Sequence, residues 1–241
     1  QVHITGIFIL KGSKVMDEGF DASAVDALHA DGKFNEVFAE ISEAYAADRN
    51  NVEIVWRYAR ACFDRQEALS DEKEREDLVR RGLVLSEAAI RLDDSHYAPH
   101  KWKAILLSEL GGHITLREKI SDSYLIRDEL ERALLAKPDD VTTLYSLGKW
   151  CQAVAGVGWA QRKIASALFE TPPRATYEDA IDFFRRAYEI SPTKRTAFAM
   201  GECYHDLCRK VECREWMQKC LDVTTMSEVE QKLDQKAKSY L

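Results

Sequence analysis

Three cysteines and a histidine lie close together near the carboxyl end of the chain, and thiolate and imidazole are ligands that zinc prefers. The group comprises Cys203, His205, Cys208 and Cys213. The helical spacing argues for another role, because Cys213 and Cys220 fall where small buried side chains are needed, and Cys208 falls in a tight turn. A free cysteine behaves as a small hydrophobe. We therefore interpret these cysteines as packing residues, with a zinc site as the alternative.

Other catalytic motifs are absent from the sequence. Gly156 and Gly158 resemble part of a phosphate-binding loop, but the third glycine, the preceding strand and the Lys-Ser/Thr of such loops are missing. No Gly-x-Ser-x-Gly and no His-Glu-x-x-His occurs. His96, His100 and His113 flank one expected helix, where we interpret them as polar edge residues, with a pH-sensitive contact as the alternative. The sequence thus predicts no catalytic residue, no metal and no cofactor, and the protein is not expected to be an enzyme.

The elements that carry these residues follow a pattern of paired helices. In a tetratricopeptide repeat, small residues at positions 8, 20 and 27 let two helices approach, a large residue at 24 fills the groove between them, and proline at 32 ends the second helix. One such unit, split by a long insert, contains Leu144, Leu147, Gly148, Cys151, Tyr177, Ala180, Phe184, Ala187 and Pro192. Arrays of this kind usually recognise partners and do no chemistry.

The repeat extends in both directions. The residues expected at position 27 are Ala44, Ala89, Ala133, Ala187 and Cys220, at spacings of 45, 44, 54 and 33. Since the ordinary repeat has ~34 residues, inserts are expected at 66–70, 111–116 and 155–175. The last insert is expected to hold a helix over 161–169, ended by the prolines at 172–173. The predicted fold is all-α: a superhelical array of antiparallel helix pairs, about five repeats with inserts, and a C-terminal capping helix over 226–241.

Composition bounds the remaining possibilities. Residues 17–241 are predicted to form this single domain, and residues 1–16 are interpreted as an N-terminal extension, either added in cloning or left from an anchor. Its apolar run is too short to span a bilayer. The net charge of −7 argues against general nucleic-acid binding. No secretory signal is visible, so the six cysteines indicate a reducing, cytoplasmic environment.

Basic residues gather in one part of this acidic chain. Residues 17–53 hold ten acids and two bases, whereas 141–169 hold three bases and no acid. Positions 5, 9 and 12 of each first helix line the concave face of such arrays. The register places there Trp56, Arg60, Phe63, Lys101, Tyr145 and Lys149, and the adjacent insert adds Arg162 and Lys163. We expect this face to hold an extended acidic peptide; side chains that are simply solvated, or that pack on the inserts, are the alternative.

Several runs are more specific than the generic repeat. They are WRYARAC at 56–62, HKWKAILL at 100–107, LGKWC at 147–151, RKIA at 162–165, TPP at 171–173 and YE at 177–178. Together they resemble the regulator of microtubule dynamics family over residues 34–222. The resemblance implies a non-enzymatic, microtubule-associated protein of the cytoplasm, acting at spindle microtubules and poles and in chromosome segregation. It implies tubulin or microtubules, and other spindle proteins, as partners, and it supplies no established set of binding residues. Some relatives carry an N-terminal membrane segment and sit on mitochondria, whereas we expect no membrane span here.

Three functions stay open. The first is direct binding to the acidic tails of tubulin by Arg60, Lys101 and Lys149. The second is a peptide-binding adaptor that reaches microtubules through a partner. The third is a binder of lipids or small molecules, in which the insert folds over the concave groove. The apolar residues of that insert are Val157, Trp159, Ile164, Leu168 and Phe169.

Overall fold

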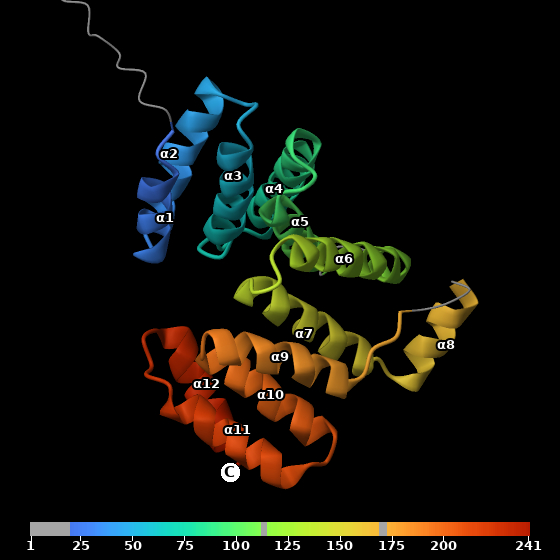
Figure 1. The fold of residues 1–241 in the computed structure, drawn as a ribbon. Helices are drawn as coiled ribbons and strands as arrows, with labels where there is room; N and C mark the ends of the chain where they lie inside the picture. The colour runs from blue at the N-terminus through green and yellow to red at the C-terminus, as the bar shows by residue number, and fades with distance from the viewer. Residues whose placement is uncertain (1–19, 112–114, 169–172) are drawn as a thin grey trace, which may run out of the picture.

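Twelve helices and no strand make up the part of the chain that the computed structural model describes, residues 20–111, 115–168 and 173–241 (Figure 1). The predicted all-α class is confirmed. The helices are α1 (Ala22–Ala30), α2 (Phe34–Ala47), α3 (Val52–Gln66), α4 (Glu72–Leu92), α5 (Tyr97–Leu110), α6 (Leu116–Ala136), α7 (Val141–Ala155), α8 (Trp159–Leu168), α9 (Tyr177–Ile190), α10 (Lys194–Asp206), α11 (Lys210–Asp222) and α12 (Glu228–Lys238).

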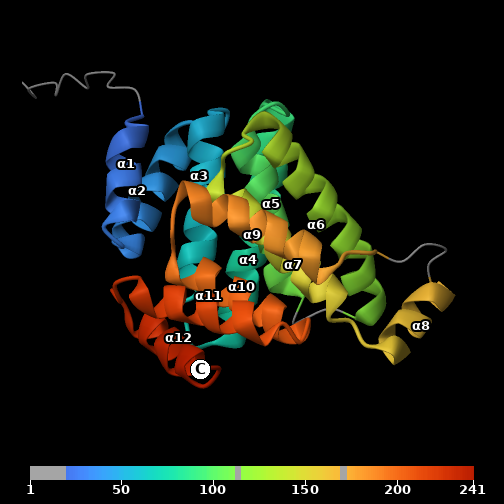
Figure 2. The same ribbon diagram turned by 60° about the horizontal axis from the view of Figure 1, so that its bottom comes forward.

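Successive helices pack as antiparallel pairs that stack into a curved array (Figure 1 and Figure 2). The pairs are α1 with α2, α3 with α4, α5 with α6, α7 with α9, and α10 with α11. Helix α8 belongs to the insert between α7 and α9 and stands at the edge of the array, while α12 packs on α10 and α11. These pairs, with their inserts and terminal helix, confirm the predicted tetratricopeptide-like array.

Close approach of paired helices explains the residues that define the repeat. A Cβ added at Gly148 would lie 2.5 Å from the Phe184 ring, and one added at Gly201 would lie 2.7 Å from the Met217 methyl group. Contacts this short do not occur between close-packed side chains. The first helix of each of these pairs therefore needs glycine where the second helix presents a large side chain, as the repeat pattern predicts.

Side-chain caps determine where two of the second helices begin. Thr176 and Asp179 form a reciprocal capping box ahead of α9. Asp71 accepts a hydrogen bond from the Glu74 amide at the start of α4. Each cap satisfies backbone donors that the first helical turn leaves without partners. The long connections before α4 and α9 therefore end at defined points, which keeps the pairs in register despite the inserts.

Two predicted boundaries are shifted. The helix expected over 161–169 spans Trp159–Leu168, and the capping helix expected over 226–241 spans Glu228–Lys238. The first proline of the pair at 172–173 and the expected N-terminal extension, 1–16, lie outside the described residues.

The buried side chains form two hydrophobic cores joined by a small bridge. The first core lies within α1 to α5, and the second within α7 and α9 to α12. The bridge consists of Ala104, Leu130 and Leu147. Among the described helices, none combines the length and apolar character of a bilayer-spanning helix. Few buried side chains therefore connect α6 to α7 in the described part of the chain, and the groove described below opens beside them.

Five of the six cysteines are buried, and Cys208 is exposed in the tight turn between α10 and α11, where its φ is 59°. Burial raises the pKa of Cys62, Cys151 and Cys203 to about 12. These thiols therefore stay protonated near neutral pH. In the described residues no group of three or more His, Cys, Asp or Glu side chains is arranged to hold a metal ion. The burial of Cys203, Cys213 and Cys220 agrees with their interpretation as packing residues, whereas Cys208 is exposed and the interpretation was wrong for it.

Candidate functional site

Ion pairs between neighbouring repeats line part of the inner face, which we define as the face formed by the first helices α1, α3, α5, α7 and α10. Asp26 of α1 accepts hydrogen bonds from Arg57 Nη2 at 2.6 Å and from Arg60 Nη2 at 2.9 Å. The Arg57 and Arg60 side chains are 7% and 9% exposed, whereas that of Asp26 is 39% exposed. Two guanidinium groups of α3 are thus buried beneath a carboxylate of the same chain.

The pKa values around this pair follow from its burial. Burial raises the pKa of Asp26, but hydrogen bonds and charge from Arg57 and Arg60 outweigh this effect and hold the pKa below its usual value. Burial lowers the pKa of Arg60, although a guanidinium remains charged at physiological pH. The buried Arg60 Nε–H has no hydrogen-bond partner among the described residues. Arg60 is therefore paired but incompletely satisfied.

Lys101 takes part in a second pair between repeats. Its Nζ lies 3.0 Å from Asp140 Oδ2, and each of the two side chains is 10% exposed. Asp140 also caps α7, because its Oδ1 accepts a hydrogen bond from the Thr143 amide at 2.8 Å. Burial lowers the pKa of Lys101, and the charge of Asp140 opposes that shift. Lys101 therefore ties α5 to α7 in the structure.

The predicted aromatic residues of this region pack in the same layer. The Trp56 ring centroid lies 4.2 Å from Arg57 Cζ, and the Phe63 ring lies 5.7 Å from that of Trp102. Trp56 is buried, whereas Phe63 is half-buried and reaches the groove described next. The structure thus places Trp56, Arg60 and Lys101 among internal contacts, and their role in binding a partner stays a prediction.

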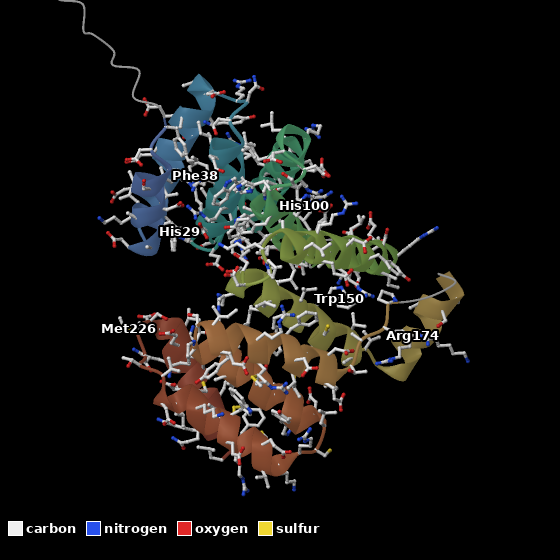
Figure 3. All side chains as sticks on the ribbon, viewed as in Figure 1. His29, Phe38, His100, Trp150, Arg174 and Met226 are labelled. Atoms are coloured by element: carbon white, nitrogen blue, oxygen red, sulfur yellow. The ribbon has the colours of Figure 1, made fainter. Side chains whose placement is uncertain are left out.

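A groove of about 1110 Å³ opens between α5, α6, α7, α8 and the segment before α9. Trp150 lies on its floor, held by a hydrogen bond of 2.8 Å from Nε1 to the Ser123 carbonyl; Figure 3 labels Trp150 on α7. The other apolar lining residues include Ile120, Ile126, Leu130, Val154 and Val157. Four of the predicted site residues line the groove together: Phe63, Tyr145, Lys149 and Arg162.

Positive charge predominates among the groove's lining residues. Its cations are Lys119, Lys149, Arg162 and Arg174, and its acids are Glu109 and Asp179. Both acids are engaged elsewhere: Glu109 Oε1 lies 3.4 Å from Arg75 Nη2, and Asp179 belongs to the capping box of α9. Among the described residues, the rim of the groove therefore carries a net positive charge on a protein whose overall charge is −7.

The predicted cations of this rim bond to neutral groups. Lys149 is exposed and donates to Gln152 Oε1 at 2.6 Å. Arg162 is also exposed, and it donates to two backbone carbonyls at the end of α7 and just after it, at 2.7 Å and 2.8 Å. Lys163 lies exposed beside it on α8. Since amide and carbonyl oxygens carry no net charge, these contacts orient Lys149 and Arg162 without neutralising them.

Sequence reasoning missed Lys119 and Arg174. Lys119 lies on α6, a second helix, and Arg174 lies on the segment from α8 to α9 (Figure 3), so neither occupies a concave position of the repeat. The acid-free stretch 141–169 was the signal that pointed toward this region. Of the five apolar insert residues assigned to a lipid, Val157 lines the groove. The side chains of the other four lie outside the described residues.

Comparison of sequences finds one family. The family model for "Regulator of microtubule dynamics protein 1-3" matches residues 22–241. Regulator of microtubule dynamics protein 1 of Bos taurus is 29% identical over 100% of this chain and 76% of its own length. The Homo sapiens protein 1 is 34% identical over 77% of this chain and 60% of its length. Protein 3 of Xenopus laevis is 33% identical over 73% of this chain, which covers 38% of that relative. The chain therefore corresponds to only part of the longer relatives.

Comparison of structures finds the same type of array. A thermophilic TPR (tetratricopeptide repeat) protein of Thermus thermophilus superimposes with a TM-score of 0.64 at 13% identity, over 91% of this chain and 96% of that one. YrrB, described as a TPR protein with an unusual peptide-binding site, gives 0.50 at 13% identity over 90% of each chain. At such identities the likeness concerns the fold alone.

Proposed function

Because the chain belongs to the regulator of microtubule dynamics family, we propose that it is a non-enzymatic, microtubule-associated protein whose helical array binds tubulin directly. In this proposal it works in the cytoplasm on the cytoskeleton, at spindle microtubules and spindle poles, and contributes to chromosome segregation. Other spindle proteins are further candidate partners.

The cationic rim of the groove is the observation that supports direct binding. Tubulin presents acidic C-terminal tails, and an acidic protein needs a local positive surface to hold them. The rim cations are Lys119, Lys149, Arg162 and Arg174. Single exposed charge pairs contribute only about 0.2–1 kcal/mol each, so the tail must engage several of them at once. Such binding is weak and falls as salt shortens the screening length to ~10 Å at 0.1 M.

Charge reversal on the rim tests this proposal. Lys149→Glu combined with Arg174→Glu changes the charge by the same amount as Lys210→Glu combined with Lys232→Glu, which are exposed cations of α11 and α12. Cosedimentation of each purified variant with microtubules is the measurement. The rim variant is expected to lose binding, and the control variant to keep it. Equal binding by both variants contradicts the rim as the tubulin site, and no binding by the wild type favours the adaptor alternative.

A second candidate function follows from the apolar floor of the same groove. A cavity of about 1110 Å³ with an apolar lining and cations at its edge suits a ligand that has an apolar chain and an anionic head. Native mass spectrometry of the purified chain tests this candidate: a retained amphiphile that is lost on Ala165→Trp, a substitution in the α8 wall of the groove, supports it. An empty protein after gentle purification contradicts it.

A further inference from the structure

Few buried contacts hold helix α1 to the array. Of its nine residues only Val25 is fully buried, and a helix this short is not stable without tertiary contacts. Two polar contacts link α1 to α3: the pairing of Asp26 with the arginines, and His29 Nε2 at 3.1 Å from Asp64 Oδ2. Figure 3 labels His29 on α1. The position of α1 therefore depends strongly on what Asp26 binds.

Helices α3 and α5 each have a buried donor that is unused among the described residues. Arg60 carries five N–H groups, and the Arg60 Nε–H and Trp102 Nε1–H are both buried without a hydrogen-bond partner among the described residues. Arg60 and Trp102 are both buried, and buried donors are normally paired. Lys101 Nζ lies 5.9 Å from the Trp102 ring centroid. Arg60 thus has an unmet donor beside its pair with Asp26, and charged N–H donors are the chemistry that binds carboxylates.

We propose that Asp26 is an internal competitor of the acidic partner. Its carboxylate occupies Arg57 and Arg60 as a glutamate of the partner would, so the docked α1 covers these two guanidinium groups of α3. Asp26 is 39% exposed, so an incoming acid can reach the pair. The exchange of one carboxylate for another leaves no buried guanidinium unpaired, which keeps its cost low. Displacement of α1 extends the partner site from the groove rim along α3; the inference rests on the proposed function.

The test uses a fluorescent glutamate decapeptide as the probe. Asp26→Asn removes the competing charge, and Asp31→Asn is the matched control, since Asp31 ends the same helix and pairs only with Lys33, at 3.4 Å, among the described residues. If α1 is docked in about nine molecules of ten, its release strengthens probe binding ~tenfold. Arg60→Gln in the Asp26→Asn background is expected to remove that gain. Unchanged or weaker binding by Asp26→Asn overturns the proposal, because a purely structural Asp26 would give that result.

A second measurement needs no variant. In the wild-type protein, the amides of α1 are expected to exchange hydrogen faster when the decapeptide is bound, because the helix is displaced. Unchanged or slower exchange overturns the proposal even where Asp26→Asn fails to fold. The two hypotheses can fail separately. If only the proposal for Asp26 is wrong, microtubule binding still falls in the Lys149→Glu and Arg174→Glu double variant. If the proposed function is wrong, that double variant leaves microtubule binding unchanged.

Discussion

Replacing Lys101 with methionine separates a structural role of this residue from a binding role. Methionine keeps most of the side chain's length and apolar packing but removes the charge that lies 3.0 Å from Asp140. Both side chains are 10% exposed, so Asp140 is left as a buried, uncompensated carboxylate, which costs about 3–5 kcal/mol. At 2–4 °C per kcal/mol for a chain of this size, Tm is expected to fall by about 6–20 °C.

Lys149→Met is the matched comparison. Lys149 is exposed and bonds to the neutral Gln152, so its replacement is expected to change stability by less than about 0.5 kcal/mol. Calorimetry and microtubule cosedimentation of both variants then give opposite profiles. Lys101→Met loses stability and, at a temperature where it is folded, keeps binding. Lys149→Met keeps stability and weakens binding by up to about fivefold, since one exposed charge pair contributes about 0.2–1 kcal/mol.

A double variant completes the comparison. Lys101→Met combined with Asp140→Asn removes both charges, so part of the lost stability is expected to return, because no buried charge is left unpaired. Unchanged Tm in Lys101→Met together with weaker binding refutes the reasoning. That result would mean that Lys101 faces the partner as the repeat register predicts.

Three other substitutions test the remaining architecture. Gly148→Ala forces its Cβ against the Phe184 ring and is expected to lower the free energy of unfolding, measured by urea denaturation, by about 1–3 kcal/mol. An unchanged free energy of unfolding contradicts the close approach of α7 and α9. A hydrogen bond to Glu129 raises the pKa of buried His100, so its stabilisation is complete below about pH 6.5 and is lost as pH rises through the raised value. The Tm difference between wild type and His100→Gln should therefore shrink from pH 6 to pH 9, and a constant difference contradicts the pairing. Lys194→Met removes a fully buried ammonium that bonds to α12 at 2.5 Å, so faster hydrogen exchange confined to α12 and its neighbours is expected; unchanged exchange in α12 argues against this link.

The fold was predictable because its determinants are local. Spacing of small and large residues, such as Gly148 against Phe184, specifies how paired helices approach, and this spacing is visible without a structure. Capping pairs such as Thr176 with Asp179 mark helix starts in the same way. The start of α8 was misplaced by two residues, since Trp159 and its neighbours fit no repeat position.

The candidate site was predictable only in part. The register placed Phe63, Tyr145 and Lys149 on the concave face, and in the structure all three line one groove. It gave no sign that Arg60 and Lys101 are paired internally, because their acids lie 34 and 39 residues away in other repeats. Long-range pairs of this kind depend on how whole repeats stack, and one repeat's pattern contains no information about that stacking.

The most direct test of the central claim compares the binding of the purified wild-type chain to intact microtubules and to microtubules whose acidic tails have been removed by protease, across a salt series. We predict binding to intact microtubules that weakens steadily as salt rises, and little binding after tail removal at any salt. Equal binding to both preparations, unaffected by salt, would contradict an array that holds tubulin through the cations of its groove.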